Sequence, residues 1–470
     1  MENWQEIIQK SGYLNLDNAL YSKVNPTELN QAKLLGLNAS FIEKNLKLNP
    51  KDENWKSLLA GEIQIENSFS MAYSGHQFGH YVPQLGDGRA INVGQVGSWQ
   101  LQLKGAGLTP YSRMGDGLAV LRSSIREFLM AEYMHAIGIP SSRSVGIVAS
   151  FSQLAQRETL EPTSIVMRAS PSWIRFGSFQ YAGISLGKKK LVQQLTELSF
   201  SQGFPKQADT SGEHLFSLAL ENTAQTLAKW QAYGFMHGVM NTDNFSILGL
   251  TIDYGPFGMM DTFSWNHSPN TSDYNGRYRY SMQPIVGKWN LEKLSEALGV
   301  AYNKDRLEKK LEDFYPSFQK HLTQALLNRL GLDLKQEDST QKLLESWFMA
   351  MEESSVDFNG FFVFLTFEDP LDTQKLKQLC GKDLKPIENW IQRYLRLEPN
   401  KEKMKKYNPV FVPKNYMLQK IIKQCSLGDF EVLQKWLSLC QNPFLMDPIL
   451  EEYKGRSPEN TDNYRLSCSS

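Results

Sequence analysis

A short segment near the middle of the chain places hydrogen-bonding and metal-binding side chains at close spacing. It reads His237-Gly-Val-Met-Asn-Thr-Asp-Asn244, and Asp253-Tyr-Gly255 begins nine residues after its end. Carboxylate and amide oxygens are the ligands that Mg²⁺ and similar hard cations prefer. Asn244 and Asp253 are therefore candidate ligands of a divalent metal ion.

The spacing of this segment matches the catalytic loop of protein kinases except at one position. That loop runs His-x-Asp-x-x-x-x-Asn, in which the Asp accepts the proton of the substrate hydroxyl and the Asn holds Mg²⁺. His237 and Asn244 have this spacing, but Val239 occupies the Asp position. Because valine cannot accept a proton, the sequence indicates either an inactive site or different chemistry with the same metal and nucleotide.

Two charged residues earlier in the chain complete the pattern of a nucleotide site. Lys104 ends a stretch of alternating apolar and polar residues, 99–104, which predicts a strand with one buried face. Glu127 lies in a predicted helix over residues 119–137. In kinases a strand lysine contacts phosphate and a helix glutamate holds that lysine. The ordered set of Lys104, Glu127, Asn244 and Asp253 therefore predicts a kinase-like fold.

The fold class that we expect is α+β and bilobal, with an antiparallel-sheet N-lobe that carries one helix and a helical C-lobe. The predicted organisation is an N-terminal segment of short helical and loop pieces, the N-lobe, the C-lobe with the catalytic-type loop, and a helical C-terminal extension, over residues 1–60, 61–180, 181–340 and 341–470 respectively. Local patterns further predict a helix over 215–233, a small hairpin over 245–253 and a loop over 398–414.

Composition limits the classes of function. The chain has 470 residues, of which 41% are hydrophobic, and a formal net charge of +0, so it has no basic excess for nucleic acid or anionic membranes. No run of about 20 apolar residues predicts a membrane span, and no secretory signal is visible. The four cysteines form no Cys-x-x-Cys pair, which is typical of a reducing compartment. We therefore expect a cytoplasmic protein with no nucleic-acid or membrane partner.

Longer stretches around these residues resemble the selenoprotein O / YdiU family of kinase-like protein nucleotidyltransferases. The matching stretches are Tyr73-Ser-Gly-His-Gln-Phe-Gly79, Gln84-Leu-Gly-Asp-Gly-Arg89, residues 103–117 and 121–129, His237 to Asn244 and Asp253-Tyr-Gly-Pro256, with a weaker likeness from Asn408 onward. The resemblance implies that ATP lies inverted in the cleft, so that its α-phosphate faces a Ser, Thr or Tyr hydroxyl of a protein. AMP is then transferred and pyrophosphate leaves.

The resemblance also implies roles for individual residues by motif position. Lys104 would bind phosphate while paired with Glu127. Asp243 would be the proton acceptor, beside Asn244 and Asp253 as ligands of Mg²⁺ or Mn²⁺. The nucleotide, ATP with UTP as an alternative, would contact Gly86, Gly88, Arg89, Asp116, Gly117, Arg168 and Arg175, of which the last two would hold the far phosphates.

Taken from the residues alone, several assignments have plainer alternatives. Asp243 could cap a turn, and Arg168 and Arg175 could form ordinary surface ion pairs. Two other functions also fit parts of the pattern: a kinase-like phosphotransferase, and a catalytically inactive nucleotide-binding pseudokinase scaffold. Val239 speaks against the phosphotransferase, since removal of a general base costs about 10²–10⁴-fold in rate. Retention of the complete metal set speaks against the scaffold.

The chain departs from the family pattern at two places. Leu118 follows Gly117 where relatives commonly carry arginine, which removes one cation from the second glycine loop. Trp265 stands where some bacterial relatives have a cysteine that pairs with one near the C-terminus. An internal disulfide to Cys468 is therefore not expected.

Overall fold

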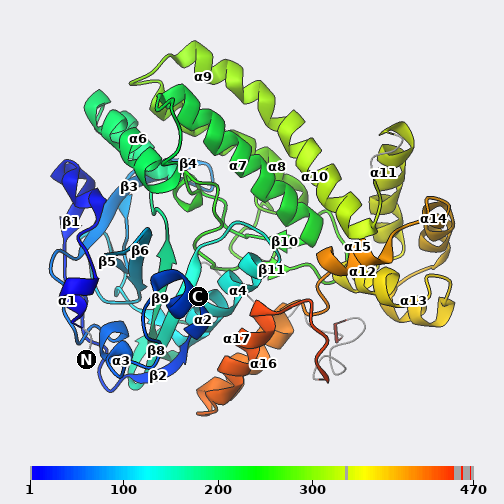
Figure 1. The fold of residues 1–470 in the computed structure, drawn as a ribbon, viewed down its shortest axis with the longest axis horizontal. Helices are drawn as coiled ribbons and strands as arrows, with labels where there is room; N and C mark the ends of the chain where they lie inside the picture. Colours follow the sequence, from blue (N-terminus) through cyan, green and yellow to red (C-terminus); the bar gives the residue numbers. More distant parts are fainter. Residues whose placement is uncertain (1–2, 334–336, 449–456, 459–465, 467–470) are drawn as a thin grey trace.

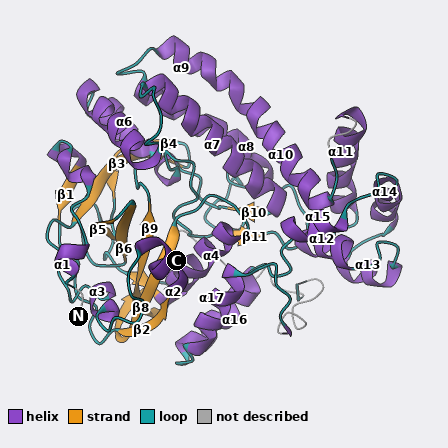
Figure 2. Ribbon diagram, viewed as in Figure 1, coloured by secondary structure: helices purple, strands orange, loops and turns teal. Residues whose placement is uncertain are grey.

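The protein has two lobes, one built on an antiparallel sheet and the other on a set of long helices (Figure 1). The structure is a computed structural model, and it describes residues 3–333, 337–448, 457–458 and 466. Figure 2 shows the strands of the large sheet together at one side, with helices filling the rest of the molecule. The predicted α+β, kinase-like bilobal fold is confirmed.

Within the described residues, the N-lobe sheet has nine strands. Its main path is β1 (Tyr21–Lys23), β3 (Phe69–Gln77), β5 (Ala90–Val96), β6 (Trp99–Lys104), β9 (Leu160–Ser170), β8 (Arg143–Gln156) and β2 (Lys33–Leu37). Two further strands pair off this path, β4 (His80–Gly86) with β3 and β7 (Ala119–Val120) with β9. Neighbouring strands run antiparallel, as expected.

Both faces of β6 are buried, so the prediction of a single buried face was wrong. Leu101 and Leu103 pack into a core shared with Trp55 and other residues of the N-terminal segment. On the opposite face Gln102 is 0% exposed, because helix α4 (Leu121–Ala136) packs on the neighbouring strands β8 and β9 there. Polar side chains on this face must therefore find partners inside the protein.

The N-terminal segment contributes strands, which the prediction of helical and loop pieces missed. β1 pairs with β3 and β2 pairs with β8, and these two strands end the main path of the sheet. The described part of the segment also contains the short α-helices α1 (Trp4–Ile7), α2 (Ala39–Phe41) and α3 (Trp55–Leu59).

The C-lobe is organised around α7 (Gly212–Tyr233), which confirms the helix predicted over 215–233. Ser211 caps its first turn by accepting from the His214 N–H, and Gly234 ends it at a φ of 72°. The chain then enters β10 (Phe235–Met236), which pairs with β11 (Gly258–Met259) and leads into the catalytic-type loop. The neighbouring helices are α5 (Phe176–Gln180), α6 (Lys189–Gly203), α8 (Gln283–Leu298), α9 (Lys304–Lys310) and α10 (Phe314–Leu330).

The C-terminal extension is helical, and its last helices return to the N-lobe. Figure 1 shows α16 and α17 lying beside α4, and both pack on it. The loop predicted over 398–414 was wrong in part, because α15 occupies its middle and is capped by Asn400. The helices are α11 (Glu337–Glu353), α12 (Phe358–Phe367), α13 (Thr373–Leu379), α14 (Lys385–Leu395), α15 (Lys401–Tyr407), α16 (Asn415–Ser426) and α17 (Glu431–Gln441).

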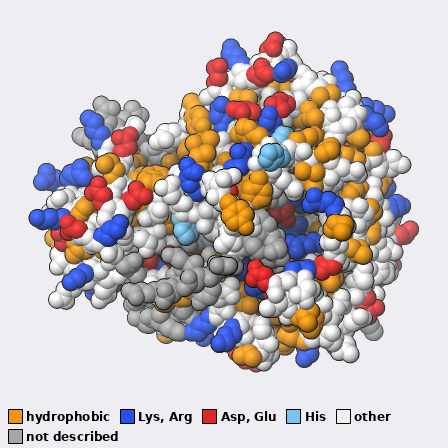
Figure 3. All heavy atoms as spheres, turned by 180° about the vertical axis from the view of Figure 1, so that it is seen from behind, with side chains coloured by type: hydrophobic (Ala, Val, Ile, Leu, Met, Phe, Trp, Pro, Cys, Tyr) orange, Lys and Arg blue, Asp and Glu red, His pale blue; other side chains and the backbone are white. Residues whose placement is uncertain are grey.

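The distribution of charged side chains on the surface is consistent with the formal net charge of +0 of the sequence. Acidic and basic side chains are intermixed over the face shown in Figure 3. None of the helices in the described part of the chain combines the length and apolar character needed to cross a bilayer.

Candidate active site

A cleft of about 960 Å³ lies between the N-lobe sheet and the catalytic-type loop, at the upper end of the usual size range of ligand sites. The sequence-predicted site residues meet in it, although they are up to 167 positions apart in the chain, from Gly86 to Asp253. Only Glu127 lies outside the cleft wall, behind Lys104. The predicted residues that line it are Gly86, Gly88, Arg89, Lys104, Asp116, Gly117, Arg168, Arg175, Asp243, Asn244 and Asp253.

The predicted lysine–glutamate pair is formed between β6 and α4. The Nζ of Lys104 lies 2.6 Å from Oε2 of Glu127, and Nη1 of Arg168 lies 2.7 Å from Oε1. Burial opposes ionisation of this carboxyl group, but Lys104 and Arg168 together hold the pKa of Glu127 below its usual value. Glu127 is therefore an anion that orients two cations of the cleft.

Asp253 is surrounded by three cations. Its Oδ1 lies 2.7 Å from Nη1 of Arg168 and 3.5 Å from Nζ of Lys104, and its Oδ2 pairs with Arg175. Although burial opposes ionisation, Arg175, Arg168 and Lys104 hold the pKa of Asp253 well below its usual value. Its backbone φ of 58° is uncommon for a residue other than glycine and is typical of functional sites. Both carboxylate oxygens are thus engaged by the protein's own cations.

Arg168 and Arg175 are buried, so the alternative of ordinary surface ion pairs is wrong. They are 1% and 2% exposed. The guanidinium of Arg168 lies over the ring of Trp173, and that of Arg175 lies over the ring of Tyr73. Arg175 also donates to the backbone carbonyl of Asp243 at 2.8 Å. Two fixed guanidinium groups at the cleft wall suit the recognition of phosphate oxygens.

His237 holds the catalytic-type loop in shape. Its Nε2 donates to the carbonyl of Ile252 at 2.9 Å, next to Asp253, and its Nδ1 accepts from the Val239 N–H at 3.4 Å. Burial lowers the pKa of His237, which keeps the ring neutral. In the same loop Asn244 donates from Nδ2 to the carbonyl of Val239. No described residue donates a hydrogen bond to the amide oxygen of Asn244, so this oxygen fits the role of a metal ligand.

Asp243 is a buried carboxyl group on the 3₁₀ turn 242–244. Burial raises its pKa to about 6, and its Oδ1 has no hydrogen-bond partner among the described residues. Gly75 of β3 allows this close approach, since a Cβ there would lie 2.3 Å from Oδ1. A carboxyl group with a pKa near neutrality is well matched to general-base chemistry.

The β3–β4 hairpin is attached directly to the catalytic-type loop. The His76 N–H donates to Thr242 Oγ1 at 2.7 Å, and the Phe78 N–H donates to Asn241 Oδ1 at 3.1 Å. These bonds cross between the lobes beside Asp243. The hairpin therefore forms one wall of the cleft.

The second glycine loop carries a cation that the sequence did not reveal. Arg157, from the turn between β8 and β9, pairs with Asp116 at 2.7 Å and donates to the carbonyl of Leu118 at 3.0 Å. A guanidinium thus lies beside Leu118. Gly117 is required here, because at its φ of 73° a Cβ would meet the backbone of Gly107 at 2.3 Å.

Sequence reasoning also missed Asp87 and Gln102, which contact the two arginines inside the protein. Asp87 stands between Gly86 and Gly88, in one of the stretches that resemble the family. Its place between two predicted nucleotide-binding glycines could have marked it as a site residue. Gln102 gave no signal, because its side chain was predicted to be exposed. Arg89 was predicted, and it makes no ion pair with any described residue.

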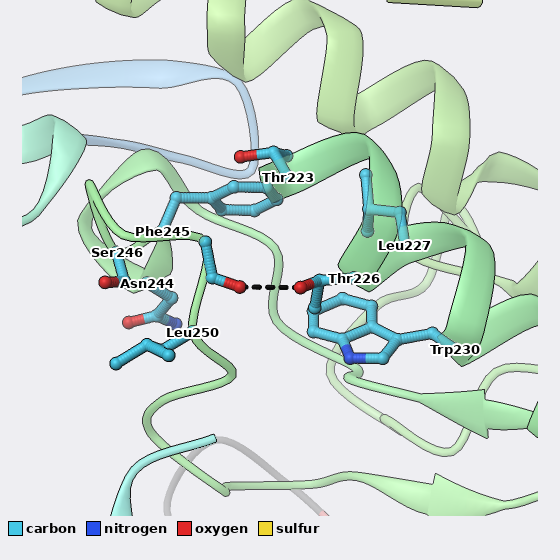
Figure 4. A pocket seen from close by; sticks show the side chains of 9 residues that line it. Thr223, Thr226, Leu227, Trp230, Asn244, Phe245, Ser246 and Leu250 are labelled. Atoms are coloured by element: carbon cyan, nitrogen blue, oxygen red, sulfur yellow. Dashed lines mark hydrogen bonds between the residues drawn. The ribbon is translucent and has the colours of Figure 1, made fainter. Parts of the chain in front are cut away.

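The prediction of a hairpin after Asn244 was wrong. The segment is instead anchored on α7. It retains a single bridge between Phe245 and Thr251. Figure 4 shows the small cavity that it shares with α7, where Thr226 donates to the carbonyl of Gly249 at 2.7 Å. With a volume of about 10 Å³, this cavity has room for about one water molecule. The larger cleft is therefore the candidate site.

A metal ion in the cleft would need ligands from outside the protein. In the described part of the chain no group of three or more His, Cys, Asp or Glu side chains could hold a metal. Asn244 and Asp253 offer an amide oxygen and a carboxylate. Mg²⁺ commonly binds through one or two carboxylates, water and substrate phosphates, so these residues fit a metal ion that binds together with a nucleotide.

Comparisons with known proteins find similar sequences that match most or all of this chain. The family model described as "Protein adenylyltransferase SelO" matches residues 6–441. A protein nucleotidyltransferase YdiU of Ectopseudomonas mendocina (strain ymp) is 36% identical over 491 residues, covering 100% of both chains. Those of Pseudomonas fluorescens (strain Pf0-1) and Aliivibrio fischeri (strain ATCC 700601 / ES114) are 41% and 37% identical, covering 85% and 100% of both chains. The chain therefore belongs to the SelO/YdiU family of protein nucleotidyltransferases.

Proposed function

We propose that this protein transfers AMP from ATP, with UMP from UTP as an alternative, to Ser, Thr or Tyr hydroxyl groups of proteins. The observation that carries the proposal is the position and state of Asp243. It is a buried carboxyl group with a pKa raised to about 6, next to Asn244, while the usual kinase base is replaced by Val239. Asp243 would therefore act as the base at a position different from that of the kinase aspartate.

In the proposed reaction the acceptor hydroxyl oxygen attacks the α-phosphorus, and the bond from that phosphorus to the bridging oxygen of pyrophosphate breaks. Asp243 takes the hydroxyl proton. Lys104, Arg168 and Arg175 stabilise the negative charge on the phosphates and on the leaving pyrophosphate. Bound Mg²⁺ or Mn²⁺, held by Asn244 and Asp253, would supply further neutralisation of the phosphate charge.

Asp253 has to change partners for this reaction. It now binds the two arginines and lies near Lys104. Phosphate oxygens are alternative partners for these cations, so a nucleotide would release the Asp253 carboxylate. We therefore expect nucleotide and metal to bind more tightly together than either binds alone.

Separately labelled ATP distinguishes the proposed function from its alternatives. Wild-type protein and the Asp243→Asn variant are incubated with Mg²⁺ or Mn²⁺, a protein acceptor, and ATP labelled on the α- or the γ-phosphate. Metal-dependent transfer of α-label, lost in the variant, is the expected result. Transfer of γ-label alone would overturn the proposal in favour of a phosphotransferase, and nucleotide binding with no transfer to any acceptor would favour the pseudokinase scaffold.

A further inference from the structure

Gln102 connects Arg168 to the first glycine loop through a buried amide. Its Oε1 accepts from Nε of Arg168 at 3.0 Å and from Nη2 at 2.6 Å. Its Nε2 donates to Oδ2 of Asp87 at 3.2 Å and to Oδ1 of Asn92 at 3.3 Å. Gln102 is 0% exposed, so water cannot replace these partners.

The amide group is chemically matched to this position. A guanidinium group only donates hydrogen bonds, and an ionised carboxylate only accepts them. The oxygen of Gln102 must therefore face Arg168, and its NH₂ group must face Asp87. An apolar side chain of similar size would leave both buried charges without these bonds.

Asp87 links the same chain of contacts to Arg175. Its Oδ2 also accepts from the Met71 N–H at 3.1 Å, which fixes it to β3. Its Oδ1 lies 3.6 Å from Nη2 of Arg175 and is buried without a hydrogen-bond partner among the described residues. The loop of Gly86 to Arg89 is thereby tied to the arginine that also contacts Asp253.

Together these side chains form a closed ring. Asp253 joins the two arginines on the cleft side, and Asp87 with Gln102 joins them on the side of the sheet. If Asp253 were to bind a metal ion, Arg168 and Arg175 would lose the carboxylate that they share in the cleft. Their contacts inside the sheet do not depend on that exchange.

We propose that Gln102 and Asp87 are positioning residues, which keep Arg168 and Arg175 directed at the phosphates of the nucleotide. This inference rests on the proposed nucleotide site. It predicts that Gln102 acts on phosphate recognition without contacting the nucleotide itself.

The test compares Gln102→Met with a matched control on the same strand. Gln100 lies two residues away on the same face and is 6% exposed, but its amide bonds to Ser11 and Gln95 and not to the arginines. Dissociation constants for ATP with Mg²⁺, for inorganic tripolyphosphate and for adenosine are measured by calorimetry, together with Tm. Since hydrogen bonds to charged groups are the stronger ones, Gln102→Met should weaken ATP and tripolyphosphate binding by about tenfold or more.

Adenosine affinity should stay unchanged in Gln102→Met, and Gln100→Met should bind all three ligands like wild type. The inference would be overturned if Gln102→Met bound ATP as tightly as wild type. It would also be overturned if Gln102→Met and Gln100→Met lost the same amount of ATP affinity. If Gln102→Met does not fold, the Asp87→Asn variant is used to test the inference. It should show the same loss of ATP affinity and a raised KM for ATP. Wild-type protein that binds ATP but transfers nothing would refute the proposed function alone, and wild-type protein that binds no ATP would refute both.

Discussion

Replacing Asp253 by asparagine should destabilise the metal-free protein strongly. The change removes the shared anion of Arg168, Arg175 and Lys104, whose side chains are only 2%, 2% and 12% exposed. Breaking a buried ion pair from one side typically costs about 3–5 kcal/mol, because an uncompensated charge stays behind. Glu127 and Asp87 remain as partial partners, so we expect a loss of about 3 kcal/mol.

The pH dependence of this loss has a defined sign. The folded-state pKa of Asp253 lies well below its usual value of 3.8, so its contribution to stability is present above that usual value. The contribution disappears as pH falls toward the folded-state pKa. The stability difference between Asp253→Asn and wild type should therefore be full at neutral pH and shrink in acid.

The assay is urea unfolding in the presence of EDTA, monitored by circular dichroism. The control variant is Asp116→Asn. Asp116 also forms an ion pair with an arginine of the cleft, Arg157, but its side chain is 41% exposed, and such pairs contribute about 0–1 kcal/mol. Tripolyphosphate should restore part of the stability of Asp253→Asn, because it binds the released cations. An Asp253→Asn variant as stable as wild type at neutral pH would refute this reasoning.

Three further changes test other parts of the structure. Asp243→Asn should lower AMP transfer by about 10² or more, and wild-type transfer should rise with pH through about 6, since the carboxylate is the reactive form; a pH-independent rate across that value would contradict the assignment. Gly75→Ala should reduce transfer because its Cβ would displace Asp243, whereas the control Gly36→Ala, with contacts of 3.5 Å or more, should not. Lys414→Met should lower the free energy of unfolding by about 3–5 kcal/mol, because it strands the buried Asp357 carboxylate; an unchanged urea midpoint would show that this pair contributes nothing.

The elements that hold the site were predictable because their patterns are local. The alternation in residues 99–104 and the apolar stripe of α7 each follow from one element's own periodicity. The order of Lys104, Glu127, Asn244 and Asp253 predicted the fold because these side chains serve together in a site for nucleotide and metal. The role of Asp243 stays a prediction that the experiments above address.

Features that depend on packing between distant segments could not be predicted. The alternation of β6 did not reveal that the N-terminal segment covers one face while α4 lies over the other. The ladder β2–β8 joins residues more than 100 positions apart, and no local pattern encodes it. The contacts of Asp87, Gln102 and the two arginines likewise arise only when β6 and β9 meet the loop after β4 and the N-terminus of α5. Cys468 lies outside the described residues, so the expectation of no disulfide there stays a prediction.

The most direct test of the central claim is the mass of a protein acceptor after reaction with unlabelled ATP and Mg²⁺ or Mn²⁺. We predict a gain of one adenylyl group on a Ser, Thr or Tyr hydroxyl, with one pyrophosphate released per modified site, and no gain with Asp243→Asn. A gain of one phosphoryl group with release of ADP would contradict the claim.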